Sequence, residues 1–216
     1  MMGAIRALAR LFFFIFYRVE VMGIGNVPTE GGAILCANHV GLKDMFLIGY
    51  RLRRKVRWMA KEELFRNRLI GRLLRSLGAY PVGRGRADLT SVKVTYRLLD
   101  EGELIGIFAE GTRQGRAKGR DGRGVGDGRG EAGGEPAGDG AGKGKAHPGV
   151  AMFASKKGVP VIPVFISGTR AFSRIYVVFG EPGTVTAEDG KDYAAISAAI
   201  MGKVYGLDPR KAGGGA

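Results

Sequence analysis

The stretch that decides the fold is GGAILCANHVGLKD, residues 31–44. Two glycines precede an apolar run that ends at Ala37, and the polar pair Asn38 and His39 follows directly. A short apolar run bounded by turn residues predicts a buried β-strand. An acidic residue, Asp44, stands where the next apolar run begins, so we expect a helix from there. A buried strand followed by a helix is typical of an α/β arrangement.

Apolar and helical patterns continue this alternation along the chain. Further strands are predicted at residues 20–23, 56–60, 79–82, 104–108, 160–166 and 175–179, and further helices from about 44 toward the basic run at 51–57, and at 64–77 and 87–101. The last helix carries apolar residues at helical spacing and ends before Gly102. Strands alternating with helices predict one α/β domain with a largely parallel central sheet flanked by helices.

Two prolines lie within the apolar segment VPVIPV, residues 159–164. Proline cannot donate a ladder hydrogen bond, so a strand that contains it is expected at a sheet edge or in an irregular part of a sheet.

Residues 115–144 break the alternation. They hold 13 glycines in 30 positions, together with charged residues and almost no apolar ones. Such a composition cannot bury enough apolar surface to offset chain entropy, which predicts a disordered surface insertion. We therefore expect the domain itself to comprise residues 21–114 and 145–216. Residues 115–146 have seven basic and five acidic side chains, so most of the chain's net charge of +14 belongs to the folded part.

The N-terminal segment combines Arg6 and Arg10 with an aromatic-rich apolar run at 11–17. Seven residues are too few to span a bilayer. In a helix the two arginines lie one turn apart with most of the aromatic bulk elsewhere, a pattern of helices that lie in a membrane interface. We expect residues 1–20 to form such an amphipathic membrane-associating helix. The alternative is a helix packed on the protein's own core.

Charge and cysteine content narrow the class of protein. With 34 basic and 20 acidic residues, the chain should attract anions such as nucleic acid, acidic lipid headgroups or phosphorylated substrates. One cysteine, Cys36, excludes an intrachain disulfide and a cysteine metal cluster, and fits a reducing, cytosolic compartment. The two histidines, His39 and His147, leave little material for a metal site, so no bound metal is predicted.

His39 and Asp44 are the candidate catalytic pair. On one continuous helix their spacing would rotate the side chains about 140° apart, whereas a turn at Gly41 would bring them together. A carboxylate bonded to one imidazole nitrogen raises the basicity of the other, which can then take a proton from an alcohol. The spacing alone also fits a structural histidine beside a capping aspartate. Cys36, three residues before His39, is a possible nucleophile, although its apolar strand favours core packing.

Four separated blocks resemble, in order, the glycerolipid acyltransferase family that includes 1-acyl-glycerol-3-phosphate acyltransferases. They are NHVGLKD at 38–44, matching the family's N-H-x4-D; GAYPVGR at 78–84, similar to G-x5-R; FAEGTR at 108–113, close to F-P-E-G-T-R with Ala109 in place of proline; and VPVIPV at 159–164. Together they cover roughly residues 30–180 apart from the insertion.

The resemblance implies transfer of a fatty acyl group from an acyl-carrier-protein or coenzyme A thioester to lysophosphatidic acid, which gives phosphatidic acid. His39 would be the general base and Asp44 its orienting partner, with no covalent acyl-enzyme and no cofactor beyond the thioester co-substrate. The residues expected to bind or organise the substrate phosphate are Arg84, Glu110, Gly111, Thr112, Arg113, Lys145 and His147. The 159–164 strand would support the acyl pocket. Such an enzyme would be peripheral or monotopic at the cytosolic face of the cell membrane, against its anionic surface.

Two departures from the family pattern concern the phosphate site. Many relatives carry a lysine where His147 stands, and Lys145 lies nearby as another cation. The insertion replaces a short loop, and it could cover the site, bind acidic partners or have no specific role.

Other functions are also open. Glycerol 3-phosphate or another lysophospholipid is an alternative acceptor. An alternative of a different class is a non-catalytic basic protein that binds nucleic acid through the Gly/Arg-rich segment. Nucleic acid is nevertheless not expected as a partner, because that segment nearly balances its charges and lacks aromatic residues for base stacking. A nucleotide-binding site is disfavoured, because Gly111 and Thr112 lack P-loop spacing.

Overall fold

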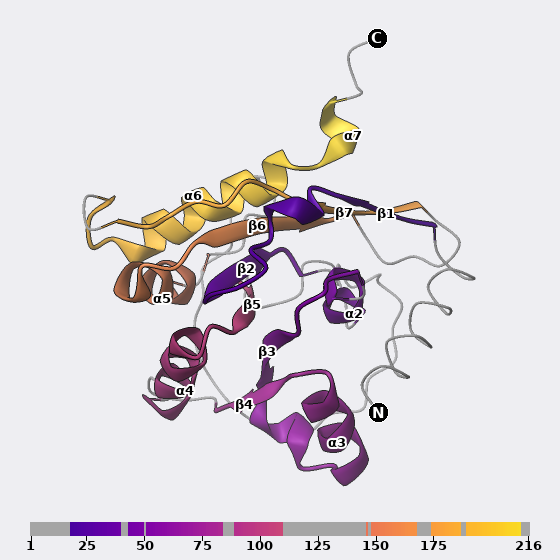
Figure 1. Cartoon of the computed structure of the whole chain (residues 1–216), viewed down its shortest axis with the longest axis vertical. Coiled ribbons are helices and arrows are strands. Elements are labelled where there is room, and N and C mark those ends of the chain that lie inside the picture. Colours follow the sequence, from indigo (N-terminus) through magenta and orange to yellow (C-terminus); the bar gives the residue numbers. More distant parts are fainter. Residues whose placement is uncertain are drawn as a thin grey trace, which may run out of the picture.

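In the computed structural model, the described residues are 18–39, 43–49, 51–83, 89–109, 146, 148–167, 174–186 and 189–212. These residues form a seven-stranded sheet with the strand order β1-β7-β6-β2-β5-β3-β4 (Figure 1). The strands are β1 (Arg18–Met22), β2 (Ala33–Ala37), β3 (Val56–Lys61), β4 (Tyr80–Val82), β5 (Leu104–Phe108), β6 (Val161–Ile166) and β7 (Arg174–Phe179).

The sheet is largely parallel, as predicted. Strands β6, β2, β5, β3 and β4 all run in one direction, β7 is antiparallel to β6, and β1 is parallel to β7. Parallel neighbours need a crossover between them, and helices in the chain supply those connections. The carboxyl ends of five strands therefore meet at one edge of the sheet, where α/β proteins place their sites.

Helices cover both faces of the sheet. They are α2 (Asp44–Gly49), α3 (Arg68–Ser76), α4 (Leu89–Asp100), α5 (Gly149–Lys157), α6 (Tyr193–Gly206) and the short α7 (Pro209–Ala212), with 3-10 turns η1 (Ile24–Asn26) and η2 (Glu62–Phe65). Figure 1 shows α2 and α3 on one side of the sheet and α4, α5 and α6 on the other. We call these the α2–α3 face and the α4–α6 face. None of the described helices is long and apolar enough to cross a bilayer.

Strand β2 lies at the centre of the core and is fully buried. Its side chains alternate: Ala33, Leu35 and Ala37 pack into the cluster of the α2–α3 face, and Ile34 and Cys36 into that of the α4–α6 face. A strand covered on both faces needs a continuous apolar run, which is why this segment could be identified from sequence.

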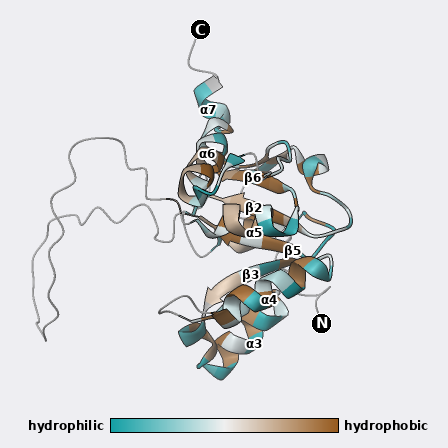
Figure 2. Ribbon diagram, turned by 90° about the vertical axis from the view of Figure 1, so that its left-hand side faces the viewer, coloured by the Kyte–Doolittle hydropathy of each residue, from teal (hydrophilic) through white to brown (hydrophobic). Residues whose placement is uncertain are grey.

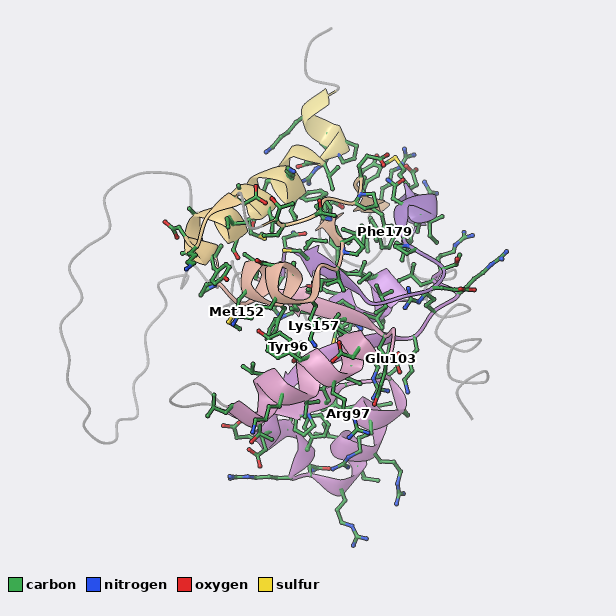
Figure 3. The ribbon with its side chains drawn as sticks, turned by 60° about the vertical axis from the view of Figure 1, so that its left-hand side comes forward. Tyr96, Arg97, Glu103, Met152, Lys157 and Phe179 are labelled. Atoms are coloured by element: carbon green, nitrogen blue, oxygen red, sulfur yellow. The ribbon has the colours of Figure 1, made fainter. Side chains whose placement is uncertain are left out.

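Helices α4 and α5 are joined by a polar contact at the edge of the core. The Lys157 ammonium of α5 forms an ion pair with Asp100 of α4 at 2.7 Å. The same ammonium lies 5.3 Å from the ring centroid of Tyr96, and Figure 3 shows these two side chains next to each other. This partly exposed pair is one of the contacts between the two helices, and an exposed ion pair contributes little to stability.

Two element boundaries differ from the sequence prediction. The helix expected at 64–77 begins only at Arg68, because the Asn67 side chain accepts hydrogen bonds from the backbone N–H groups of Leu69 and Ile70 and caps it there. Residues 1–17 of the predicted N-terminal helix lie outside the described residues. Residues 18–20 belong to β1, whose alternating Val19 and Val21 pack against the core.

The prediction of an edge position for the proline-bearing strand was wrong, because β6 lies between β7 and β2. The predicted irregularity is present. The Pro163 carbonyl accepts a hydrogen bond from Gly180 N at 2.8 Å, so the missing N–H of the proline falls on the β7 side. There the register shifts by one residue between the Val164–Phe179 pair and the Val161–Gly183 bridge.

Candidate active site

His39 and Asp44 meet where β2 leads into α2. His39 Nδ1 lies 2.8 Å from Asp44 Oδ2, with the histidine side chain 20% exposed and the aspartate side chain 0% exposed. The backbone N–H groups of Phe46 and Leu47 both bond to the Lys43 carbonyl, so the helix starts after His39. The two side chains are therefore not on one helix, and the predicted contact between them is confirmed. The turn expected at Gly41 lies outside the described residues.

Asn38 fixes the chain on the strand side of this pair. Its amide nitrogen donates to the Ile166 carbonyl at 2.9 Å, and its amide oxygen accepts from Ile166 N at 2.8 Å. The side chain thus continues the ladder between β2 and β6 beyond the end of β2. The sequence motif that contains Asn38 predicted no role for this residue. Its position directly after a buried strand did indicate one, because a polar side chain there needs hydrogen-bond partners.

The imidazole of His39 stacks on Phe108, which in turn stacks on Trp58, and we call these rings the aromatic column. The His39 and Phe108 ring centroids are 4.3 Å apart at an interplanar angle of 29°, and Phe108 stacks on Trp58 at 4.9 Å and 11°. A Cβ on Gly106 would lie 2.3 Å from the Trp58 ring, so only glycine leaves room for that ring. Sequence reasoning missed this column. A glycine inside an apolar strand was the available signal for close approach.

Residues 18–167 match the family described as Acyltransferase. The chain belongs to this acyltransferase family. A 96-residue segment is 38% identical to the 1-acyl-sn-glycerol-3-phosphate acyltransferase of Bacillus subtilis (strain 168), covering 44% of this chain and 48% of that protein. Over 157 residues it is 26% identical to a chloroplastic 1-acyl-sn-glycerol-3-phosphate acyltransferase of Arabidopsis thaliana, covering 71% of this chain and 37% of that protein.

The fold of this acyltransferase family member also has a solved counterpart. The crystal structure of the 1-acyl-sn-glycerophosphate (LPA) acyltransferase from Thermotoga maritima superposes with a TM-score of 0.67 and 22% identity, covering 98% of this chain and 80% of that one. This similarity supports the α/β fold. The chain spans less than half the length of the two curated acyltransferases named above, at 48% and 37%.

The residues predicted to bind phosphate lie outside the described part of the acyltransferase. These are Arg84, Glu110, Gly111, Thr112, Arg113, Lys145 and His147. The described residues before two of these segments are informative, because Gly83 follows β4 and Ala109 follows β5. Both strands run parallel with β2 in the sheet. The chain therefore enters both segments at the sheet edge where His39 lies, and the phosphate-binding roles stay predictions.

Cys36 lies in the core and not beside the catalytic pair. It is 0% exposed, and its Sγ lies 3.8 Å from Met201 Sδ of α6. Because side chains alternate along β2, Cys36 points to the α4–α6 face, whereas His39 stacks on Phe108 at the α2–α3 face. This position agrees with the core-packing interpretation and is unsuitable for a nucleophile acting with His39.

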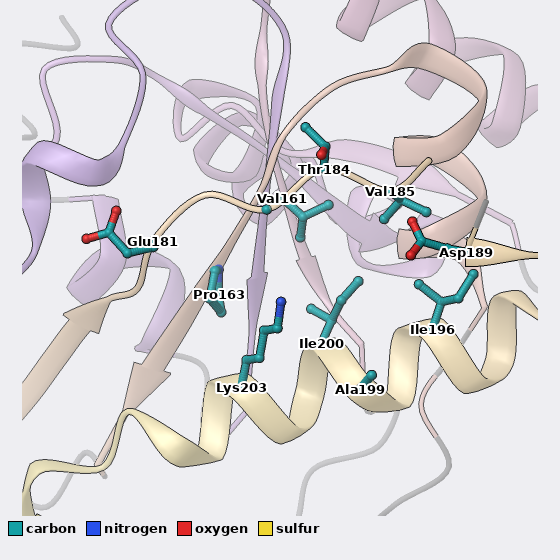
Figure 4. A pocket seen from close by; sticks show the side chains of 11 residues that line it. Val161, Pro163, Glu181, Thr184, Val185, Asp189, Ile196, Ala199, Ile200 and Lys203 are labelled. Atoms are coloured by element: carbon teal, nitrogen blue, oxygen red, sulfur yellow. The ribbon is translucent and has the colours of Figure 1, made fainter. Parts of the chain in front are cut away.

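A cavity of about 190 Å³ lies between β6 and α6. Figure 4 shows Ile200 and Lys203 of α6 pointing toward Val161 and Pro163 of β6. This cavity is on the α4–α6 face and contains none of the residues predicted for catalysis or phosphate binding. It is therefore separate from the candidate active site.

Proposed function

We propose that this protein transfers a fatty acyl group from an acyl thioester to the free hydroxyl of 1-acyl-glycerol 3-phosphate, which yields phosphatidic acid. The observation that carries the proposal is the His39–Asp44 hydrogen bond at the carboxyl edge of the sheet, in a chain of the acyltransferase family. The acceptor is suggested by two relatives that are named for this lysophosphatidate chemistry.

His39 acts as general base in the proposed reaction. Asp44 accepts a hydrogen bond from Nδ1–H, which leaves Nε2 unprotonated and able to take the proton of the acceptor hydroxyl. The resulting oxygen attacks the thioester carbonyl, a carbon–oxygen ester bond forms, and the carbon–sulfur bond breaks. The departing thiolate takes the proton back from the imidazolium. Acyl transfer is direct, so the reaction needs no protein nucleophile and no cofactor beyond the thioester.

The phosphate of the acceptor is assigned to the cations that follow β4 and β5. Arg113 belongs to the segment entered from β5, the neighbour of β2, whereas Arg84 follows β4, three strands from β2. At strand spacing these entry points are roughly 5 Å and 14 Å from β2. We therefore assign Arg113 as the first phosphate ligand and Arg84 as the second, since a guanidinium offers paired donors to phosphate. Glu110 organises these cations, the backbone at Gly111 and Thr112 adds N–H donors, and Lys145 and His147 complete the set.

The donor and the cellular location complete the proposal. A net charge of +14 suits an acidic acyl carrier protein, a coenzyme A thioester and an anionic membrane surface alike. We place the protein on the cytosolic face of the membrane as a peripheral or monotopic enzyme, with the residues before β1, 1–17, as its membrane-associating segment.

The test is a transfer assay with purified full-length protein on phospholipid vesicles. Labelled acyl-carrier-protein and coenzyme A thioesters are each offered with lysophosphatidic acid, and then with glycerol 3-phosphate or lysophosphatidylcholine. Labelled phosphatidic acid is the expected product, and His39→Ala should lower its rate by about 10² to 10⁴ fold. Lys93→Gln, at an exposed position of α4, is the matched control. No phosphatidic acid from the wild type, or full activity in folded His39→Ala protein, would overturn the proposal.

A further inference from the structure

Helix α3 presents an unusual outer surface. Its inner side packs on the core through Leu74 and on η2 through Gly71, where an added Cβ would lie 2.8 Å from the Phe65 carbonyl oxygen. Four apolar side chains point outward from η2 and α3. These are Leu64 (41% exposed), Leu69 (76%), Ile70 (46%) and Leu73 (48%), which we call the α3 apolar stripe.

Exposed large hydrophobic side chains are concentrated in the α3 apolar stripe. Of the seven exposed large hydrophobic side chains in the described part of the chain, four belong to it. Single exposed apolar residues are normal on soluble proteins, whereas a contiguous group marks a binding surface. Figure 2 shows hydrophobic and hydrophilic residues alternating along α3 at the margin of the molecule.

Basic side chains accompany the stripe. Arg66, Arg68, Arg72 and Arg75 are all exposed, and residues 62–76 carry these four arginines against two glutamates. Within the described residues none of the four arginines forms an ion pair. At about 100° per residue, the three arginines of α3 lie together on the helix side between its buried residues and the stripe. An apolar face bordered by arginines is the pattern of a helix that lies in the plane of an anionic bilayer.

We propose that the α3 apolar stripe docks on an anionic lipid bilayer, with its leucines and isoleucine among the acyl chains and its arginines at the phosphates. The arginines can pair with the negative charge of anionic headgroups. This charge complementarity favours an anionic lipid surface over an apolar partner that carries no negative charge. The stripe is on the α2–α3 face, where Leu74 shares a core cluster with Trp58, and the column from Trp58 leads to His39. Docking would therefore place the His39 side of the sheet next to the membrane. This inference concerns binding, and it is independent of the proposed acyl transfer.

The first test measures co-sedimentation of the full chain with vesicles of phosphatidylcholine alone or mixed with phosphatidylglycerol. The double substitution Leu69→Gln with Leu73→Gln should weaken binding about tenfold or more. Leu89→Gln is the matched control, because Leu89 is 67% exposed on α4, at the opposite face. Arg68→Gln with Arg72→Gln should weaken binding to the anionic vesicles by about fivefold for each charge. Lys93→Gln with Arg97→Gln removes the same charge from α4 and should have less effect.

A second measurement reports insertion at α3 itself, because residues 1–17 alone could hold the chain on vesicles. An environment-sensitive dye is attached through Leu73→Cys, or through Leu89→Cys as control, in a Cys36→Ala background. Vesicles should shift the emission of the dye at 73 to the blue and allow its quenching by spin-labelled lipid, and leave the dye at 89 unchanged. A dye at 73 that stays in water on vesicle-bound protein overturns the proposal. A shift without vesicles, produced by higher protein concentration or by an acidic carrier protein, also overturns it.

Discussion

Asp44, whose side chain is 0% exposed, holds His39 through a 2.8 Å contact between Oδ2 and Nδ1 at the edge of the buried core. The carboxylate is fixed at the first residue of α2. His39 therefore has one ring nitrogen held by Asp44 and one ring face stacked on Phe108.

Replacing Asp44 with asparagine keeps the shape of the side chain and removes its charge. The asparagine amide can donate to Nδ1, which then leaves the proton on Nε2, the wrong nitrogen for a base. We expect Asp44→Asn to lower kcat by about 10² to 10⁴ fold with little change in KM. Steady-state acyl-transfer kinetics provide the measurement, with Asp100→Asn on the surface of α4 as control. Equal kcat in both variants would show that Asp44 has only a structural role.

Gly106→Ala tests the aromatic column. An added methyl group would lie 2.3 Å from the Trp58 ring, so Trp58 and the stacked Phe108 would have to move. We expect the free energy of unfolding to fall by about 1 to 3 kcal/mol, in line with overpacked cores, and kcat to fall as His39 loses its support. Urea denaturation monitored by Trp58 fluorescence gives the stability.

The control for Gly106→Ala is Gly202→Ala in α6. Apart from the nearby backbone of α6 itself, no heavy atom lies within 4 Å of a Cβ built at Gly202, so the substitution should raise stability by about 0.5 to 1 kcal/mol through its effect on helix entropy. If both alanine variants change stability alike, close packing at Gly106 is not what selects glycine there.

Arg54 connects the segment at residues 28–31 to the turn at Gly102. Its guanidinium donates to four backbone carbonyls, those of Pro28, Glu30, Gly31 and Gly102. A lysine ammonium cannot reproduce this planar fork, so Arg54→Lys should reduce the free energy of unfolding by about 1 to 3 kcal/mol. Arg53→Lys, at an exposed neighbouring position, should have almost no effect in the same denaturation experiment. Arg54, within the basic run at 51–57, therefore connects backbone segments in addition to adding to the surface charge.

Sequence could predict the strands because β2, β5 and β6 are short apolar runs covered on both faces, and β1 alternates polar and apolar residues. The observed bounds of the strands lie within about two residues of the expected ones. Sequence could also predict the His39–Asp44 pair, whose spacing became informative beside the other family blocks. The sequence could not predict the aromatic column, because β5 lies between β2 and β3 in the sheet but not along the chain. Only that strand order places Phe108 against both His39 and Trp58.

The Gly-rich segment gives a prediction that rests on sequence alone. Deleting residues 116–143 should leave the acyl-transfer rate within about twofold, since a flexible surface loop changes closure entropy only slowly with its length. The acyl-transfer rate and the thermal unfolding temperature are both measured for the deletion variant and the wild type. A large loss of rate with an unchanged unfolding temperature would instead assign the segment a part in substrate binding.

Tyr80 should make the protein sensitive to alkaline pH. Its hydroxyl lies 3.0 Å from Thr95 Oγ1 between β4 and α4, and burial raises the pKa of Tyr80 from 10.0 to about 12. Because the folded pKa lies above the unfolded one, the stabilising contribution is complete below pH 10 and is lost as the pH rises through 12. At about 1.4 kcal/mol per pKa unit, the loss is on the order of 3 kcal/mol. Urea denaturation across this range should show a steeper decline for the wild type than for Tyr80→Phe, which has no phenol to ionise. Parallel declines in the two proteins would mean that ionisation of Tyr80 is not coupled to unfolding.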